Sequence, residues 1–261
     1  MPIGTMDVVM NFPYEDLRSY YRRWYRPDLQ GLVIVGDVNP DEIEQKIKDM
    51  FADIAPAAAD AAKREVIPVP DNEEPLVSIQ KDKEQTMAYA LIMFKYEATP
   101  REMKSTMPYL FQNYLMGAIS GMFAERLREM SQKPDCPFIQ AGVSFGEYLV
   151  AKSKESVTAQ IAMKEGKYLD GIAAVYREVL RAKRGGFTEA EYERYKQEYL
   201  SRLDAQYEAR DKVQNTHYVD EYVRYFLDNE PAPGIEWEHQ NMKSIVPMLP
   251  LDALNQAFPQ L

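Results

Sequence analysis

The segment Trp24–Asn39 constrains the fold more than any other part of the chain, because it predicts three elements in close succession. Pro27 ends the amphipathic helix before it, since proline has no backbone N–H to donate. The run Leu32–Val35 is apolar and β-branched at three of its four positions, which predicts a strand buried on both faces. Asn39 and Glu42 then have the spacing of a helix cap. Helix, strand and helix in this order predict part of an α/β domain.

The residues around this segment do not supply enough strands to close a core. The first helix is expected over Tyr14–Trp24, with Leu17 and Tyr21 on its apolar face. One strand with two helices needs sheet partners, and no second strand is predicted before the linker. We therefore expect residues 1–54 to be the C-terminal part of a truncated first α/β domain. Residues 55–75 mix alanine, charge and proline without apolar periodicity, which is typical of a linker.

Residues 76–261 have the pattern of a second α/β domain. Strand pairs alternate there with groups of helices, which predicts an α+β fold: a mixed or antiparallel sheet with helices packed on one face. The run Thr86–Phe94 is apolar on both faces and is therefore expected to be a central strand. The expected strands cover Leu76–Gln80, Thr86–Phe94, Ile139–Phe145 and Val157–Met163, and the expected helices cover residues 100–130, 168–185, 188–207, 216–227 and 236–245, with a last turn over 251–258. Thr188 with Glu191 three residues later has the spacing of a capping box, which predicts the start of the helix over 188–207.

The composition excludes several classes of function. The net charge of −10 argues against nucleic acid, whose phosphates require a basic surface, and against anionic membranes. No apolar run approaches the roughly 20 residues that a membrane-spanning helix needs. The N-terminus has neither the basic region nor the apolar core of a signal peptide, although a longer parent chain could carry a leader. The single cysteine excludes an internal disulfide and leaves the compartment open.

The two histidines do not have the spacing of a metal site. His217 has Glu221 four residues later, so both side chains could share one helix face. One such pair is short of the three protein ligands that a zinc site usually has. His239 lies in an acidic stretch and has no further ligand at a suitable spacing. The sequence therefore favours ordinary surface histidines and predicts no metal ligand in this chain.

No side chain has the surroundings of a catalytic nucleophile. Cys136 follows Asp135 and has no nearby basic group that would favour its thiolate. Ser120 lacks the Gly-x-Ser-x-Gly elbow, and the small residues Gly117, Ser120 and Gly121 indicate instead that another element packs closely. The eighteen tyrosines fall mostly at core spacing on helices. We therefore predict no catalytic residue, and substrate-binding residues stay unassigned.

Four segments in order resemble the insulinase/pitrilysin-like zinc metallopeptidases, a family that includes the mitochondrial processing peptidases. The end of that family's first domain resembles WYRPDLQGLVIVGDVNPDEIE. Its long helix and following strand resemble AISGMFAERLREMSQKPDCPFIQAGVSFG, and a later helix resembles FTEAEYERYKQEYLSRL. The end of its second domain resembles NEPAPGIEWEHQNMKSIVPMLPLDALNQAF. The resemblance covers nearly the whole chain and implies the end of a first domain followed by a second, non-catalytic domain of the processing-peptidase type.

The resemblance also implies where the catalytic residues of such a peptidase would be. The family's zinc site is a His-x-x-Glu-His helix early in the first domain, and no part of this sequence aligns with it. Zinc is therefore implied for the parent protein and not for this chain. In the other half of such a peptidase, an arginine is followed seven positions later by a tyrosine. Arg128 falls on the position of this arginine. Seven positions after it this chain has Asp135, and the next aromatic residue, Phe138, has no hydroxyl group.

These features together imply the non-catalytic portion of an insulinase/pitrilysin-like zinc metallopeptidase. The chain would support the catalytic domain and the peptide-binding chamber, while the parent, a zinc metalloendopeptidase, would hydrolyse peptides. Its partners would be the remaining peptidase domains and a peptide substrate, and the family suggests a periplasmic or organellar location. An exposed apolar surface at residues 1–54 is expected to allow self-association. A scaffold of the same fold without peptidase activity, and an unrelated acidic α+β binding module, are the alternatives.

Overall fold

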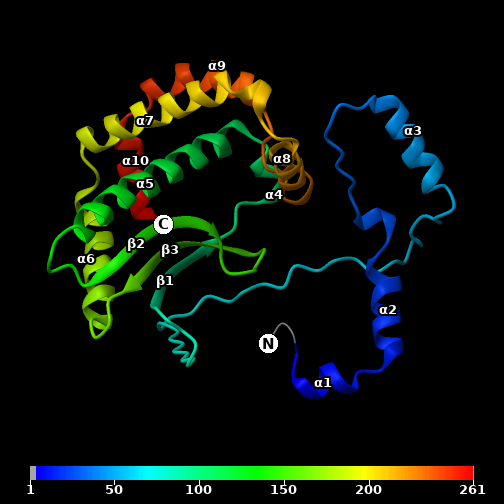
Figure 1. Ribbon diagram of the computed structural model, residues 1–261, viewed down its shortest axis with the longest axis horizontal. Coiled ribbons are helices and arrows are strands. Elements are labelled where there is room, and N and C mark those ends of the chain that lie inside the picture. The colour runs from blue at the N-terminus through cyan, green and yellow to red at the C-terminus, as the bar shows by residue number, and fades with distance from the viewer. Residues whose placement is uncertain (1–3, 261) are drawn as a thin grey trace. The chain divides into compact units, whose positions relative to one another are not determined.

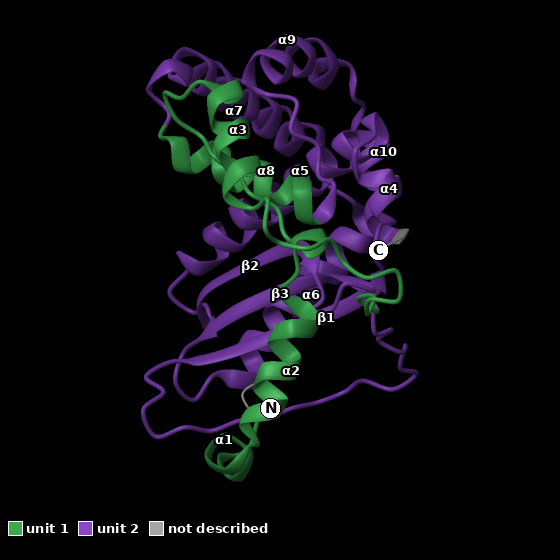
Figure 2. Ribbon diagram, turned by 90° about the vertical axis from the view of Figure 1, so that its right-hand side faces the viewer, with its two compact units in different colours: residues 1–65, 214–227 green, residues 66–213, 228–261 purple. Residues whose placement is uncertain are grey.

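The computed structural model describes residues 4–260 of the chain, which form two compact units (Figure 2). Unit 1 contains the residues up to Glu65 together with Gln214–Leu227. Unit 2 contains Val66–Val213 and the residues from Asp228 onward. The chain therefore leaves unit 1, forms most of unit 2, returns to unit 1 for one helix, and ends in unit 2. Among the described helices, none combines the length and apolarity required to span a membrane.

Unit 1 is helical in its described part. Its elements are α1 (Met6–Asn11), α2 (Tyr14–Trp24), the 3-10 helix η1 (Pro27–Leu29), α3 (Pro40–Met50) and all but the last residue of α8 (Asn215–Asp228) (Figure 1). The predicted cap of α3 is confirmed, because Asn39 Oδ1 accepts a hydrogen bond from the Asp41 backbone N–H at 3.1 Å. Asn39 Nδ2 also donates to Glu42 Oε1 at 3.3 Å. These ends follow from short-range sequence signals alone.

The strand predicted at Leu32–Val35 is wrong. These residues are neither helix nor strand, and they are not buried on both faces: Leu32 and Ile34 are exposed, and the two valines are half-buried. A strand also needs a neighbour to take its backbone hydrogen bonds, and the described residues of unit 1 contain no strand. The strand predicted at Leu76–Gln80 is wrong for the same reason, since no strand pairs with this segment in the described structure.

Unit 2 is built on a three-stranded antiparallel sheet in the order β1-β3-β2. The strands are β1 (Ala88–Glu97), β2 (Phe138–Glu147) and β3 (Lys154–Met163). Three of the predicted strands are thus confirmed. The prediction that the first of them is central is wrong, because β3 pairs on both sides and β1 pairs only with β3. Ile161 of β3, for example, lies opposite Ala90 of β1 and Ala141 of β2.

Helices pack against one face of this sheet. They are α4 (Arg101–Lys104), α5 (Met107–Ser131), α6 (Tyr168–Gly185), α7 (Glu189–Glu208), α9 (Ile235–Ile245) and α10 (Leu251–Ala257), with the short 3-10 helices η2 (Arg210–Lys212), η3 (Val246–Met248) and η4 (Phe258–Gln260). The helix α5 contacts mainly β2, α6 contacts β3, α7 packs on α5, and α9 packs on α7 (Figure 1). The predicted α+β fold, with helices on one face of an antiparallel sheet, is confirmed.

The core of unit 2 lies between the sheet and the helices. Phe123 of α5, Phe138 of β2 and Ile161 of β3 have no exposed surface, and Tyr192 of α7 closes the layer above α5. Only one face of β1 contributes side chains to this core. On its other face Tyr89 and Leu91 are about half exposed, 52% and 53% respectively. The apolar residues on both faces of this strand therefore do not indicate burial on both faces.

Candidate functional site

The structure gives neither histidine the surroundings of a metal site. His217 is exposed on α8 in unit 1, where its ring makes an edge contact with Tyr218. His239 belongs to unit 2 and places Nε2 2.7 Å from Asp204 Oδ1, while its ring stacks on Tyr207. No group of three His, Cys, Asp or Glu side chains among residues 4–260 is arranged to hold a metal ion. These residues do not fit a zinc site, so we assign no zinc-dependent step to them.

The two nucleophile candidates are part of the packing of unit 2. The Cys136 side chain is buried, and its Sγ contacts the carbonyl oxygen of Phe138 at 3.5 Å. Ser120 lies within α5, beside two glycines that contact Tyr195 of α7. A Cβ added at Gly121 would lie 2.6 Å from Tyr195 Cε2. The prediction that these small residues permit close packing of another element is confirmed.

The residues at the family's arginine–tyrosine positions do not converge. Arg128 is exposed at the surface of α5, where its guanidinium group pairs with Glu125 of the same helix at 2.6 Å. Asp135 is exposed in the loop after α5, and Phe138 is completely buried in the core. Neither Asp135 nor Phe138 therefore supplies a hydroxyl group beside Arg128.

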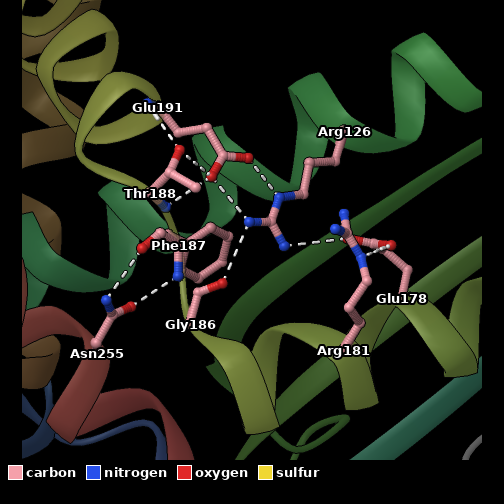
Figure 3. Close-up of polar contacts among 8 residues, drawn as sticks. All are labelled: Arg126, Glu178, Arg181, Gly186, Phe187, Thr188, Glu191 and Asn255. Atoms are coloured by element: carbon pink, nitrogen blue, oxygen red, sulfur yellow. Dashed lines mark hydrogen bonds and ion pairs between the residues drawn. The ribbon is translucent and has the colours of Figure 1, made fainter.

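The most developed polar arrangement of unit 2 surrounds Arg126, whose side chain is 9% exposed (Figure 3). Its Nε and Nη2 atoms donate to the two carboxylate oxygens of Glu191 at 2.5 and 2.8 Å. Its Nη1 donates to Glu178 Oε1 at 3.1 Å, and Nη2 also donates to the carbonyl of Gly186 at 3.2 Å. One guanidinium group thereby connects α5, α6, α7 and the loop before α7. We call Arg126, Glu178, Arg181 and Glu191 the arginine clamp.

Local sequence signals place Glu191 but not its partner. The predicted capping box is confirmed: Thr188 Oγ1 accepts from the Glu191 backbone N–H, and Glu191 Oε2 accepts from the Thr188 backbone N–H at 2.8 Å. Both carboxylate oxygens of Glu191 also accept hydrogen bonds from Arg126. Because Arg126 and Glu191 are far apart along the chain, no spacing rule connects them. The clamp therefore leaves no recognisable signal in the sequence.

The loop before α7 is held from a second side. Gly186 has φ +70°, a backbone conformation that favours glycine. The backbone N–H of Phe187 donates to Asn255 Oδ1 at 2.8 Å, and Asn255 Nδ2 donates to the Phe187 carbonyl at 3.1 Å (Figure 3). The Arg126 guanidinium lies over the Phe187 ring, 4.5 Å from its centroid. The loop, α5 and α10 are therefore joined at one point.

The charged groups of the arginine clamp pair with one another inside the fold. Burial by itself would raise the pKa of Glu191, but hydrogen bonds from Arg126 and Thr188 outweigh it and lower this pKa to about 2. The hydrogen bond to Glu191 in turn raises the pKa of Arg126. Two guanidinium groups and two carboxylates balance, since Arg181 donates to Glu178 at 2.7 and 2.8 Å. Both carboxylates are occupied by arginines, so neither is placed to act as a general base or metal ligand.

The fold and this site define an α+β domain whose most developed polar arrangement is a buried cluster of ion pairs. A family model described as the peptidase M16 inactive domain matches residues 11–199, well over half of the chain. The chain therefore belongs to this family and is a non-catalytic domain region of insulinase-like proteases. The predicted resemblance to the insulinase/pitrilysin-like peptidases is confirmed.

Individual relatives agree with the family match. The chain is 27% identical over 254 residues to “Zinc protease PQQL-like” of Arabidopsis thaliana, covering 95% of this chain and 23% of the relative. It is 22% identical over 260 residues to “Probable zinc protease PqqL” of Escherichia coli, covering 100% of this chain and 27% of the relative. The chain thus spans about a quarter of the length of these curated relatives.

Solved structures show the same fold. The first half of the periplasmic protease PqqL from Escherichia coli matches with a TM-score of 0.80 at 21% identity, over 100% of this chain and 54% of that chain. A second structure, “Predicted insulinase family protease from Yersinia pestis”, matches with a TM-score of 0.77 at 16% identity, over 94% of this chain and 52% of that chain. The arrangement of elements described above is therefore shared with proteases of this family.

Proposed function

We propose that this chain works as the non-catalytic wall of a longer PqqL-like zinc protease that hydrolyses peptides. In this role it supports the catalytic domain and lines the chamber that holds the peptide. The observation that carries the proposal is the match of residues 11–199 to the inactive domain of the peptidase M16 family. The relatives named as zinc proteases support a zinc site elsewhere in the parent protein.

We also propose a division into domains. Residues 1–54 are the C-terminal part of a truncated first α/β domain, residues 55–75 are a linker, and residues 76–261 form the second domain. Two observations support it. Residues 55–75 contain neither helix nor strand. The helices of unit 1 bury none of their described side chains and leave large apolar residues such as Leu17 and Met50 exposed. Such helices need further sheet partners to cover their apolar faces. The remaining domains of the parent would supply these partners.

The proposal is tested by assaying the purified chain with a fluorogenic peptide mixture, with and without added zinc. We expect no cleavage and no bound zinc after dialysis, as measured by elemental analysis. Adding the catalytic domain of the same parent, identified by its His-x-x-Glu-His motif, should yield zinc-dependent cleavage that a chelator abolishes. Cleavage by the purified chain alone, lost on chelation, would contradict the proposal. Equal activity of the catalytic domain with and without this chain would contradict the supporting role.

The alternative is a scaffold of the same fold that acts only in assembly. The exposed apolar surface of unit 1 suits either role. The two are distinguished by whether the parent carries the zinc motif. A periplasmic location is also part of the proposal, supported by the description of the Escherichia coli PqqL structure as a periplasmic protease. Fractionation of cells that express the full parent gene would test it.

A further inference from the structure

The second half of α6 carries a cluster of arginines on one face. Arg177, Arg181 and Arg184 are separated by four and three residues, a spacing that aligns side chains along a helix. Together with Leu180 and Gly185 they line a shallow groove of about 450 Å³. We call it the arginine groove. Its position on the outer side of α6 is independent of unit 1, because every lining residue belongs to unit 2.

The positive charges of Arg177 and Arg184 are not compensated by an ion pair within the described structure. Arg181 pairs with Glu178, but Glu178 is buried and already receives a hydrogen bond from Arg126 (Figure 3). No ion pair is formed by Arg177 or Arg184 with any residue of the described range. Like charges at this spacing repel each other on a helix. The cluster is therefore unusual in a chain with a net charge of −10.

Helix capping accounts for only part of this cluster. Arg184 lies in the last turn of α6, where a cation interacts favourably with the negative end of the helix dipole. Arg177 lies two turns earlier, beyond the range of that effect. Its alignment with the other two arginines thus has no explanation in the stability of α6 by itself.

We propose that the arginine groove binds an acidic peptide segment through the carboxylates of its Asp or Glu side chains. Guanidinium groups bind carboxylates in paired hydrogen bonds. Side chains on one face of an extended peptide repeat about every 6.6 Å, close to the 5–6 Å between neighbouring arginines on a helix face. A polynucleotide would bind this surface less well. Its phosphates continue beyond the groove and would be repelled by a protein with a net charge of −10. The inference is independent of whether the parent hydrolyses peptides.

The test is a fluorescence anisotropy titration of the whole chain with a labelled peptide of alternating Glu and Ser. The matched probe replaces each Glu with Gln. We expect binding of the Glu peptide that weakens with added salt, and no measurable binding of the Gln peptide. The double variant Arg177→Gln/Arg184→Gln should weaken binding about tenfold or more, since each arginine contributes charge-assisted hydrogen bonds. Both residues lie outside the clamp, so the variant should remain folded at the temperature of the titration.

The control variant Arg22→Gln/Arg23→Gln removes the same net charge from α2 and should bind within about twofold of the parent chain, because long-range charge is screened by salt. Equal binding of the Gln and Glu peptides would overturn the proposal. So would an equal loss of affinity in the control and groove variants, or no loss in either. Tighter binding of a single-stranded oligonucleotide than of a peptide with the same number of charges would also overturn it.

Discussion

Units 1 and 2 both contain helices with clear capping signals, but they differ in what those helices bury. The helices α2 and α3 of unit 1 have the predicted starts, and Asn39 caps α3 as Thr188 caps α7. In unit 2 the helices enclose a core with fully buried residues such as Phe123 and Tyr192. In the described part of unit 1, no helix buries a single side chain. Correct local signals thus produce helices in both units, while only unit 2 assembles the sheet that gives them a core.

The largest expected effect comes from removing one aromatic side chain from each unit. Phe123→Ala should lower the free energy of unfolding by about 3–5 kcal/mol, because it opens a cavity among Phe187, Phe258 and the sheet. Phe51→Ala in unit 1 should change it by about 0.5 kcal/mol or less, since Phe51 is already 43% exposed. Denaturant unfolding followed by circular dichroism would measure both. Equal effects would mean that unit 1 has a core of its own.

The next effect concerns buried and exposed ion pairs. Arg126→Gln should destabilise unit 2 by about 3 kcal/mol, because Glu178 and Glu191 lose the cation that balances them. The matched control is Arg128→Gln on the same helix, whose exposed pair with Glu125 should contribute about 0.2–1 kcal/mol. Thermal unfolding of both variants at neutral pH would compare them. If the two variants have the same melting temperature, the clamp is not a stabilising element.

A smaller difference is expected between two glycines that lie against aromatic rings. Gly121→Ala places a Cβ 2.6 Å from Tyr195, which is held between α5 and α7, so we expect a loss of about 1–3 kcal/mol. Gly31→Ala in unit 1 places a Cβ 2.7 Å from Phe226, but that ring is 45% exposed and can move aside. Its effect should stay within about 0.5 kcal/mol. Urea unfolding of both variants provides the measurement.

The pH dependence of unit 2 should report the clamp. The pKa of Glu191 is about 2 in the folded chain and 4.5 as the ordinary value, so its contribution is present in full above about 4.5. That contribution is lost as the pH falls from 4.5 through about 2, because the unfolded chain takes up the proton first. Glu191→Gln should remove this slope from melting temperatures measured between pH 5 and pH 2. A slope unchanged by the substitution would assign the acid sensitivity to other carboxylates.

The smallest expected effect is a weak self-association of the chain through the exposed apolar side chains of unit 1. Tyr14, Leu17 and Tyr21 are more than half exposed on α2, an apolar surface that a second copy could cover. Sedimentation should show weak association that increases with concentration, and Leu17→Lys should reduce it. The control Leu169→Lys replaces an exposed leucine of α6 in unit 2 and should leave association unchanged. A clean monomer at high concentration would contradict this expectation.

The sequence was a good guide to unit 2 wherever the signal is local. The alternating apolar residues of Ile139–Phe145 and Val157–Met163 predicted β2 and β3, and Thr188 with Glu191 predicted the start of α7. A different signal, a continuous apolar and β-branched run, failed at Leu32–Val35, which forms no strand. Alternation describes which side chains can be buried, but a strand requires a neighbour with free backbone groups.

The sequence by itself determined the starts of α2, α3 and α7, three strands, the absence of a His-x-x-Glu-His motif and membership of the inactive peptidase family. Only the tertiary structure decided that β3 is the central strand and that Arg126 binds both Glu178 and Glu191. It also decided that His239 pairs with Asp204 and not with a metal ligand set. Caps and alternation act over a few residues and can be recognised in a sequence. Strand order and buried ion pairs join residues far apart in the chain, and their partners are chosen by packing.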